Sequence, residues 1–195
     1  MCVTMYKKQT STVALQSQKW IAEALLRLLE QYGFKEITVT QICQEAGLVR
    51  KTFYRNFNTK EDILHYIIDQ LFLSFQTVFD IRTTPPIEIF THYYEYWAKE
   101  KRLLTLLHRD DLFYLLTKKY VEYVDSMNLY FFQPQDDSFT ELESYVVRFI
   151  AGGMVSILEH WLECGFSESI ENLTTLTGTL LVSANTYLNS TNSTS

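Results

Sequence analysis

The sequence predicts an all-α protein, and three observations lead to this prediction. Six Gly and three Pro among 195 residues leave few positions that interrupt a helix. Apolar residues recur at helical spacing in successive segments, and no convincing alternation of apolar and polar residues indicates a strand. Capping signals divide the first third of the chain into short helices. We therefore expect about nine helices in two domains, of which the N-terminal one is a three-helix unit.

The N-terminal domain is expected over residues 17–62, after a flexible tail at 1–16. Ile21, Leu25 and Leu28 share one face of the first helix, and the glycine at 33 ends it. The segment Thr38-Val-Thr-Gln41 is a capping box, so a second helix starts there and stops before Gly47. A third short helix follows. The expected helices span about 17–33, 39–46 and 50–56.

A larger domain is expected over residues 63–190, with a polar tail at 191–195. Thr59-Lys-Glu-Asp62 caps the fourth helix, and Pro85-Pro86 marks the start of the fifth. The apolar stripes of the remaining segments have helical spacing. The expected helices span about 60–79, 87–98, 101–108, 111–132, 139–164 and 168–189.

Charge differs sharply between the two parts of the chain. Residues 1–60 hold nine Lys or Arg and four Asp or Glu, whereas the rest holds eight basic and nineteen acidic residues. A basic N-terminal unit on an acidic body indicates that only the N-terminal part binds a polyanion.

Several classes of protein are disfavoured. Cys2, Cys43 and Cys164 are widely spaced and form no CxxC, so we expect neither a disulfide framework nor a zinc cluster. No apolar targeting segment precedes residue 17, and no segment can span a bilayer, so we expect a cytoplasmic protein without membrane contact. Common catalytic and nucleotide-binding motifs are missing. We expect no enzyme, no cofactor and no metal, although His160 and Cys164 stand four residues apart. A buried cysteine below an interfacial histidine is the commoner arrangement.

Residues 38–57 have the layout of a helix-turn-helix, which is two short helices joined by a tight turn at Gly47. Leu48, Phe53 and Phe57 are expected to pack inward, which leaves a basic face outward. Between Leu48 and Lys60 the chain has four basic residues and no acidic residue. Such a face suits DNA, because Arg can bind guanine edges in the major groove while hydroxyl and ammonium groups bind phosphates. A solvated basic face on an ordinary three-helix unit is the alternative.

The same segment resembles the TetR/AcrR family of transcriptional regulators. Residues 37–57 carry the resemblance, with Thr52-Phe-Tyr54 and Phe57 at the family's signature positions and Lys60 at the entry to the fourth helix. The resemblance covers about residues 17–65. A weaker one, to a regulatory-domain subgroup, lies at 149–161.

The resemblance implies a homodimer whose third helices enter the major groove of a roughly palindromic operator. Val49 stands where many members carry a small polar residue, so we expect it to contact a thymine methyl. Sequence pattern and resemblance together predict these DNA-binding residues: Thr38, Thr40, Val49, Arg50, Lys51, Thr52, Tyr54, Arg55, Asn56 and Lys60.

Two helices of the larger domain are candidates for the dimer interface. The segment 139–164 is apolar on most faces, and the segment 168–189 carries no charge after position 171. Adjacent glycines at 152 and 153 favour close approach of a second backbone. Filling the monomer core is the alternative. The predicted interface residues are Phe149, Gly152, Gly153, Ile157, Trp161, Leu176, Leu180 and Ala184.

Aromatic residues make up 15% of the chain and are abundant between 92 and 130, where some could line a ligand cavity. Ordinary core and surface packing is the alternative for each of them. Arg148 could meet an anionic ligand or pair with Glu122 or Asp125. The predicted ligand-binding residues are His92, Tyr93, Tyr96, Trp97, His108, Phe113, Tyr120 and Arg148.

These features together predict a sequence-specific DNA-binding regulator, a repressor relieved by a small ligand. The alternative is a dimeric adaptor or coactivator of the same fold that acts through a protein partner.

Overall fold

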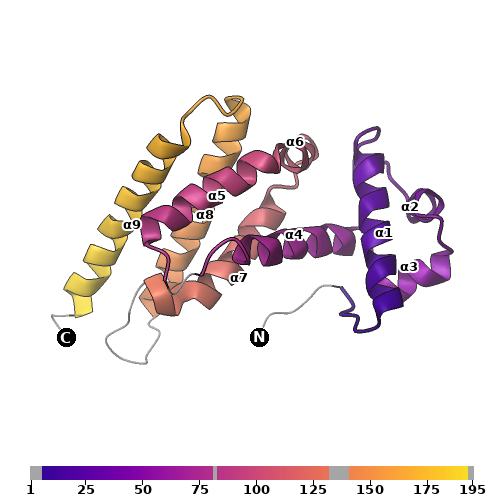
Figure 1. Cartoon of the computed structure of the whole chain (residues 1–195), viewed down its shortest axis with the longest axis horizontal. Coiled ribbons are helices and arrows are strands. Elements are labelled where there is room, and N and C mark those ends of the chain that lie inside the picture. The colour runs from indigo at the N-terminus through magenta and orange to yellow at the C-terminus, as the bar shows by residue number, and fades with distance from the viewer. Residues whose placement is uncertain (1–5, 81–82, 132–140, 193–195) are drawn as a thin grey trace. The chain divides into compact units, whose positions relative to one another are not determined.

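The computed structural model describes residues 6–80, 83–131 and 141–192, and in these segments all regular structure is helical (Figure 1). The predicted all-α fold is confirmed. The helices are α1 (Thr12–Leu29), α2 (Val39–Glu45), α3 (Arg50–Asn56), α4 (Glu61–Gln76), α5 (Pro86–Lys99), α6 (Lys101–Arg109), α7 (Tyr114–Phe131), α8 (Glu141–Glu163) and α9 (Ile170–Asn192). Among these helices none is long and apolar enough to cross a membrane.

The chain separates into two compact units, one that extends to Phe72 and one that starts at Leu73. Helix α4 runs from the first unit into the second. The sequence predicted a division after Asp62, which is earlier in this helix. The first half of α4 belongs with α1–α3 because Tyr66 packs edge-on against Phe57, with ring centroids 5.8 Å apart.

Helix α1 begins earlier than the sequence predicted. The Ser11 side chain accepts a hydrogen bond from the backbone N–H of Ala14 and so forms the N-cap, and the helix starts at Thr12. Residues before the cap also have fixed partners, since Gln18 Nε2 donates to the carbonyl of Lys7 at 2.9 Å. The prediction of a flexible tail at 1–16 is therefore corrected for residues 6–16, and residues 1–5 lie outside the described part of the chain.

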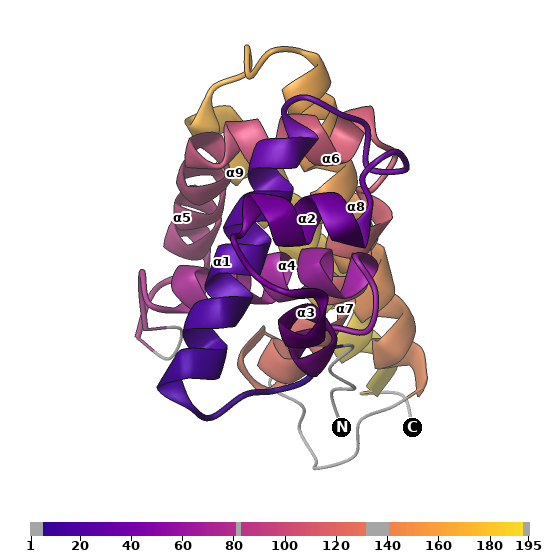
Figure 2. The same cartoon turned by 90° about the vertical axis from the view of Figure 1, so that its right-hand side faces the viewer.

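The turn from α2 to α3 has the geometry that its sequence demands. The expected capping box is present at the start of α2, where Thr38 Oγ1 accepts from the Gln41 N–H and Gln41 Oε1 accepts from the Thr38 N–H. Gly47 has φ +65, a left-handed conformation that favours glycine. Helices α1, α2 and α3 pack against one another (Figure 2). Their apolar core includes Phe53 and Phe57.

The second unit consists of the end of α4 and helices α5–α9. Helix α5 lies beside α9, and α7 lies beside α8 (Figure 1). Pro86 occupies the first turn of α5, as the sequence predicted. The hydroxyls of Tyr94 and Thr177 are 2.6 Å apart in the buried contact between α5 and α9. The Tyr93 hydroxyl donates to the Met154 carbonyl at 3.3 Å and so joins α5 to α8.

Candidate nucleic-acid interface

Helix α3 turns one face to the core of its unit and the opposite face to solvent. Phe53, Asn56 and Phe57 have no exposed surface. The side chains on the other face come from positions one and four residues apart, which lie together on a helix. They are Arg50, Lys51, Tyr54 and Arg55, and all four are exposed. Val49, the residue before the helix, is 68% exposed.

Arg50 and Tyr54 interact with each other on this exposed face. Arg50 Nη2 donates to the Tyr54 hydroxyl at 3.3 Å, and its guanidinium carbon lies 5.8 Å from the Tyr54 ring centroid. The contact uses one of the five N–H donors of a guanidinium. The other donors are available for an acceptor such as a base edge or a phosphate.

The predicted threonines differ in what their side chains do. Thr38 holds the capping box, and its hydroxyl also donates to Gln41 Oε1 at 2.7 Å. Thr40 is exposed in the first turn of α2, and Thr52 is half-buried in α3. Of the three hydroxyls, that of Thr40 is therefore the best placed to meet a phosphate.

Two predicted DNA-binding residues have internal roles instead. Asn56 is fully buried, its Nδ2 donates to the Thr52 carbonyl at 2.9 Å, and its Oδ1 has no hydrogen-bond partner among the described residues. The Lys60 ammonium donates to three carbonyls, those of Phe34 at 2.6 Å, Lys35 at 3.2 Å and Ile37 at 2.9 Å. An ammonium has three donors, so these bonds occupy all of them. Both residues are corrections to the predicted interface.

Lys7 and Gln9 adjoin the candidate interface, although no pattern in the sequence predicts this position. Lys7 Nζ donates to the Tyr54 carbonyl at 2.6 Å, and Gln9 Nε2 donates to the Arg55 carbonyl at 3.1 Å. These bonds join residues 46 or 47 positions apart, so no local sequence signal could have revealed them.

Comparison with protein families matches both parts of the chain. Residues 21–67 match the model of bacterial regulatory proteins of the tetR family, and residues 85–183 match a transcriptional regulator C-terminal region. The second match alone covers half of the chain. The chain belongs to the TetR family.

Individual relatives agree with this assignment. An HTH-type transcriptional regulator of Staphylococcus aureus is 30% identical over 66 residues, which are 34% of this chain and 36% of the relative. The dhaKLM operon transcriptional activator DhaS of Lactococcus lactis is 36% identical over 56 residues, 29% of this chain and 30% of that one. Both alignments thus span about a third of the relative. A TetR transcriptional regulator from Streptococcus agalactiae has the same fold, with a TM-score of 0.62, 18% identity, and coverage of 87% and 95% of the two chains.

The second unit of this TetR-family chain carries an exposed apolar surface on α8 and α9, which are adjacent helices. Phe149 is 71% exposed, and Leu176 and Leu180 are about half exposed. Ile157 and both glycines of α8 are half-buried. A Cβ built on Gly152 or Gly153 meets no atom within 4 Å. Phe149 and the two glycines of α8 thus border open space in the single chain.

Trp161 is the correction in this group. It is buried, its ring packs against Tyr94 and Phe166 with centroids 5.7 and 4.6 Å away, and its Nε1 donates to the Glu168 carbonyl. It therefore closes the α8–α9 turn inside one chain. The side chain of Ala184 lies outside the described part of the structure.

Four of the predicted ligand-binding residues belong to the core. Tyr93, Trp97, Phe113 and Tyr120 are all buried. Tyr93 has edge-to-face contacts with both Tyr120 and Trp97, at centroid distances of 5.5 and 6.4 Å. Tyr93, Trp97 and Tyr120 thus form a packed aromatic cluster, as the packing alternative expects, and a role of these residues in ligand binding stays a prediction.

The remaining predicted ligand residues have more exposed positions. His92 is half-buried and stacks on Phe79 with the ring centroids 5.6 Å apart, and Tyr96 is half-buried beside Phe75. Arg148 is exposed and donates to the Ser144 carbonyl of its own helix at 3.1 Å, and the side chain of Asp125, one of its two suggested partners, lies outside the described part of the structure.

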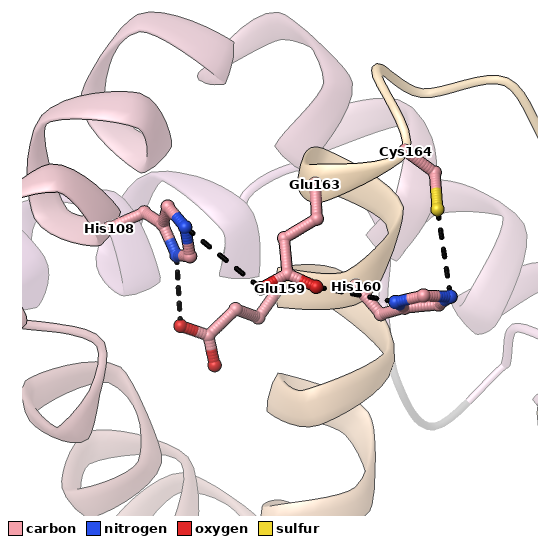
Figure 3. Close-up of polar contacts among 5 residues, drawn as sticks. All are labelled: His108, Glu159, His160, Glu163 and Cys164. Atoms are coloured by element: carbon pink, nitrogen blue, oxygen red, sulfur yellow. Dashed lines mark hydrogen bonds and ion pairs between the residues drawn. The ribbon is translucent and has the colours of Figure 1, made fainter.

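His108 lies on the surface where α6 meets α8 (Figure 3). Its Nδ1 is 3.1 Å from Glu159 Oε1, and its Nε2 is 3.9 Å from Glu163 Oε1. On the far side of Glu163, His160 Nδ1 lies 3.3 Å from that carboxylate and Nε2 lies 3.6 Å from Cys164 Sγ. Cys164 is exposed, so the expectation of a buried cysteine below His160 is wrong. In the described segments, no group of three or more His, Cys, Asp or Glu residues could hold a metal ion.

Proposed function

We propose that the chain binds a specific DNA operator, with α3 in the major groove. The observation that carries this proposal is the solvent-facing side of α3, where Arg50, Lys51, Tyr54 and Arg55 stand together after a glycine turn. The nearby core residues Phe53 and Phe57 hold this face outward. A short helix of this kind, presented by two others, is the arrangement by which helix-turn-helix proteins read base edges.

The side chains of this surface suit different parts of a DNA duplex. Arg50 can form a bidentate pair with guanine, and Val49 presents methyl groups that suit the thymine methyl. Lys51, Arg55 and Thr40 supply a cation or a hydroxyl for phosphates. Base contacts set the sequence preference, whereas phosphate contacts set the register and the salt dependence.

An anisotropy titration with labelled DNA from upstream of the chain's own gene tests operator binding. Arg50→Ala should weaken binding by about 1–3 kcal/mol and relax discrimination at one base pair, because a bidentate base contact is lost. Lys51→Ala should weaken binding to DNA of any sequence by the same factor, and should lower the salt slope of DNA binding by about one per subunit. Lys99→Ala removes an exposed lysine from the end of α5 and serves as the matched control. Equal affinities of Arg50→Ala, Lys51→Ala and the control would refute the assignment of α3.

We propose further that the chain acts as a homodimer through the exposed apolar surface of α8 and α9. Two helices from each subunit would form a four-helix interface with two-fold symmetry. A two-fold dimer presents two copies of α3 to half-sites about 34–36 Å apart, which requires a roughly palindromic operator. Joint binding of both half-sites would then raise the affinity well above that of one subunit.

We also propose that the dimer represses transcription and that a small ligand relieves the repression. A ligand lowers operator affinity only if it binds better to an arrangement that does not fit the two half-sites. Transcription in vitro from the upstream promoter tests the direction, because added protein should reduce the transcript. An increase in transcript would replace repression by activation and leave operator binding intact.

A further inference from the structure

The C-terminal end of α3 lacks the usual means of ending a helix. The last four carbonyls of any helix have no partner within it, and glycine in a left-handed conformation commonly supplies the closing turn. Here Phe57 follows α3 in an extended conformation, with φ −133 and ψ 152. Its N–H donates to the Phe53 carbonyl at 2.9 Å, which leaves three carbonyls for other donors.

Residues 6–10, which we call the N-terminal segment, supply donors to all three. Lys7 Nζ donates to the Tyr54 carbonyl and Gln9 Nε2 to the Arg55 carbonyl, at 2.6 and 3.1 Å. The backbone N–H of Lys7 donates to the Asn56 carbonyl at 3.3 Å. Each carbonyl at the end of α3 therefore has a partner, and the Lys7 ammonium also lies at the negative end of the helix dipole.

The N-terminal segment is itself fixed to the rest of the first unit. The side chain of Gln18, which is buried in α1, donates to the Lys7 carbonyl at 2.9 Å. The Tyr6 ring lies edge-on to Tyr66 of α4 with centroids 5.3 Å apart, and 6.2 Å from the Phe57 ring. The segment thus connects the end of α3 to both α1 and α4.

We propose that Lys7 and Gln9 are positioning residues for DNA recognition, which hold α3 in the orientation that reads base edges. A helix of seven residues is marginal by itself, so the bonds at its end determine how much of the population holds Tyr54 and Arg55 in place. Apparent affinity falls in proportion to the population that is competent to bind. This inference rests on the proposed operator binding by α3.

Lys8 provides a matched control on the same segment. It is exposed and carries the same charge one position away, whereas the ammonium of Lys7 is bonded to α3. A general electrostatic effect on DNA would be common to both lysines and would weaken operator and unrelated DNA alike. A positioning effect belongs to Lys7 and weakens the operator selectively, because only base reading needs the correct orientation of α3.

The experiment measures the dissociation constants of the full chain and of its variants for the upstream DNA and for a scrambled duplex. Lys7→Met keeps the side-chain stem and removes the donor, Gln9→Met does the same for the amide, and Lys7→Arg restores a cationic donor. We expect Lys7→Met to lose about tenfold in operator affinity, since a hydrogen bond from a charged donor contributes on this order. Its affinity for the scrambled duplex should fall no more than that of Lys8→Met, and Lys7→Arg should recover most of the loss.

Two results would overturn the inference. The first is an equal loss on both duplexes for Lys7→Met and Lys8→Met, which would make the effect one of charge alone. The second is unchanged operator affinity in both Lys7→Met and Gln9→Met. Thermal unfolding of every variant shows whether it is folded at the assay temperature, and Gln9→Met provides the test if Lys7→Met is not. Arg50→Ala is measured in the same series. If Arg50→Ala leaves operator affinity unchanged, operator binding by α3 is itself wrong; if only the Lys7 and Gln9 variants leave it unchanged, the positioning role alone is wrong.

Discussion

The ammonium of Lys60 links the residue before α4 to the turn between α1 and α2 by hydrogen bonds. It donates to three carbonyls of residues 34–37 and lies 4.6 Å from the Phe34 ring centroid. A phosphate could reach this ammonium only at the expense of these bonds. The residue is therefore a structural member of the first unit.

Lys60→Ala should lower the free energy of unfolding by about 1–3 kcal/mol, because three carbonyls lose a charged donor. Urea unfolding measures this change, and Lys35→Ala, at an exposed lysine of the same turn, is the control. The salt slope of operator binding should stay the same. If Lys60→Ala has an unchanged urea midpoint but a salt slope of operator binding that is lower by about one per subunit, then Lys60 contacts a DNA phosphate.

The described cysteines should differ strongly in reactivity. Cys43 is buried in α2, and burial raises the pKa of its thiol, an effect that Arg50 partly offsets. Cys164 is exposed at the end of α8 beside His160. In a Cys2→Ser background, a thiol reagent should modify Cys164 at least about tenfold faster than Cys43, and denaturant should make the two modification rates equal. Mass spectrometry of the fast product should identify Cys164, and modification at Cys43 first would contradict the described packing of α2.

Sequence reasoning worked at residues whose role depends on neighbours along the chain. The capping box of Thr38 and Gln41 and the turn at Gly47 are of this kind, since both follow from local spacing. It failed for Asn56 and Lys60. Their identity fits a motif, but the direction of a side chain is decided by residues far away, such as Phe34 for Lys60.

Among the helices, α8 and α9 are adjacent and both carry apolar side chains that a single chain leaves exposed to water, Phe149 on α8 and Leu176 and Leu180 on α9. Apolar surface of this kind marks a contact with another molecule. A Cβ built on Gly153 meets no neighbouring atom within 4 Å, so a side chain can begin there without a clash at its first atom. The surface therefore allows a substitution that affects assembly and spares the fold.

Gly153→Glu should convert the dimer to a monomer, because it places a charge and a long side chain where two backbones would meet. Size exclusion with light scattering at micromolar concentration measures the mass. Thr105→Glu, on the exposed side of α6, is the control for an added charge on a helix. Operator affinity should fall with the loss of the dimer. A wild-type chain that is monomeric under these conditions would disprove the proposed interface.

The existence of the helices was predictable because apolar spacing and capping residues are local signals. The start of α1 was not predicted, because residues 12–16 show no clear alternation of an apolar and a polar helix face. Only the N-cap residue Ser11 indicates the start. The exposed side of α8 was only partly predicted. Trp161 lies on the predicted stripe, but the turn formed by residues 164–169 folds back over it.

The many buried tyrosines determine how the stability of the protein responds to alkaline pH. Burial raises the pKa of Tyr123 to about 12 and that of Tyr93 well above its ordinary value. Burial also raises the pKa of Tyr94, an effect that its hydrogen bond with Thr177 partly offsets. The native state therefore holds these phenolic protons more tightly than the unfolded state does.

The free energy of unfolding should fall as pH rises from about 10 towards 12. Below pH 10 these tyrosines are neutral in both states and contribute no pH dependence. Above it, each proton that only the native state retains lowers the free energy of unfolding by about 1.4 kcal/mol per pH unit. Urea midpoints across this range measure the slope, and Tyr123→Phe should make it shallower. An identical slope in Tyr123→Phe would show that this phenol titrates normally in the native state.

The bonds between the N-terminal segment and α3 also have a consequence for the order of events during synthesis. Lys7 and Gln9 leave the ribosome before their acceptors at Tyr54 and Arg55, which follow 47 and 46 residues later. Closing so long a loop is slower than forming any of the short helices between them. The N-terminal segment is therefore synthesised before α3 but engaged last in this unit, and the end of α3 gains these partners only after all of α1–α3 has emerged.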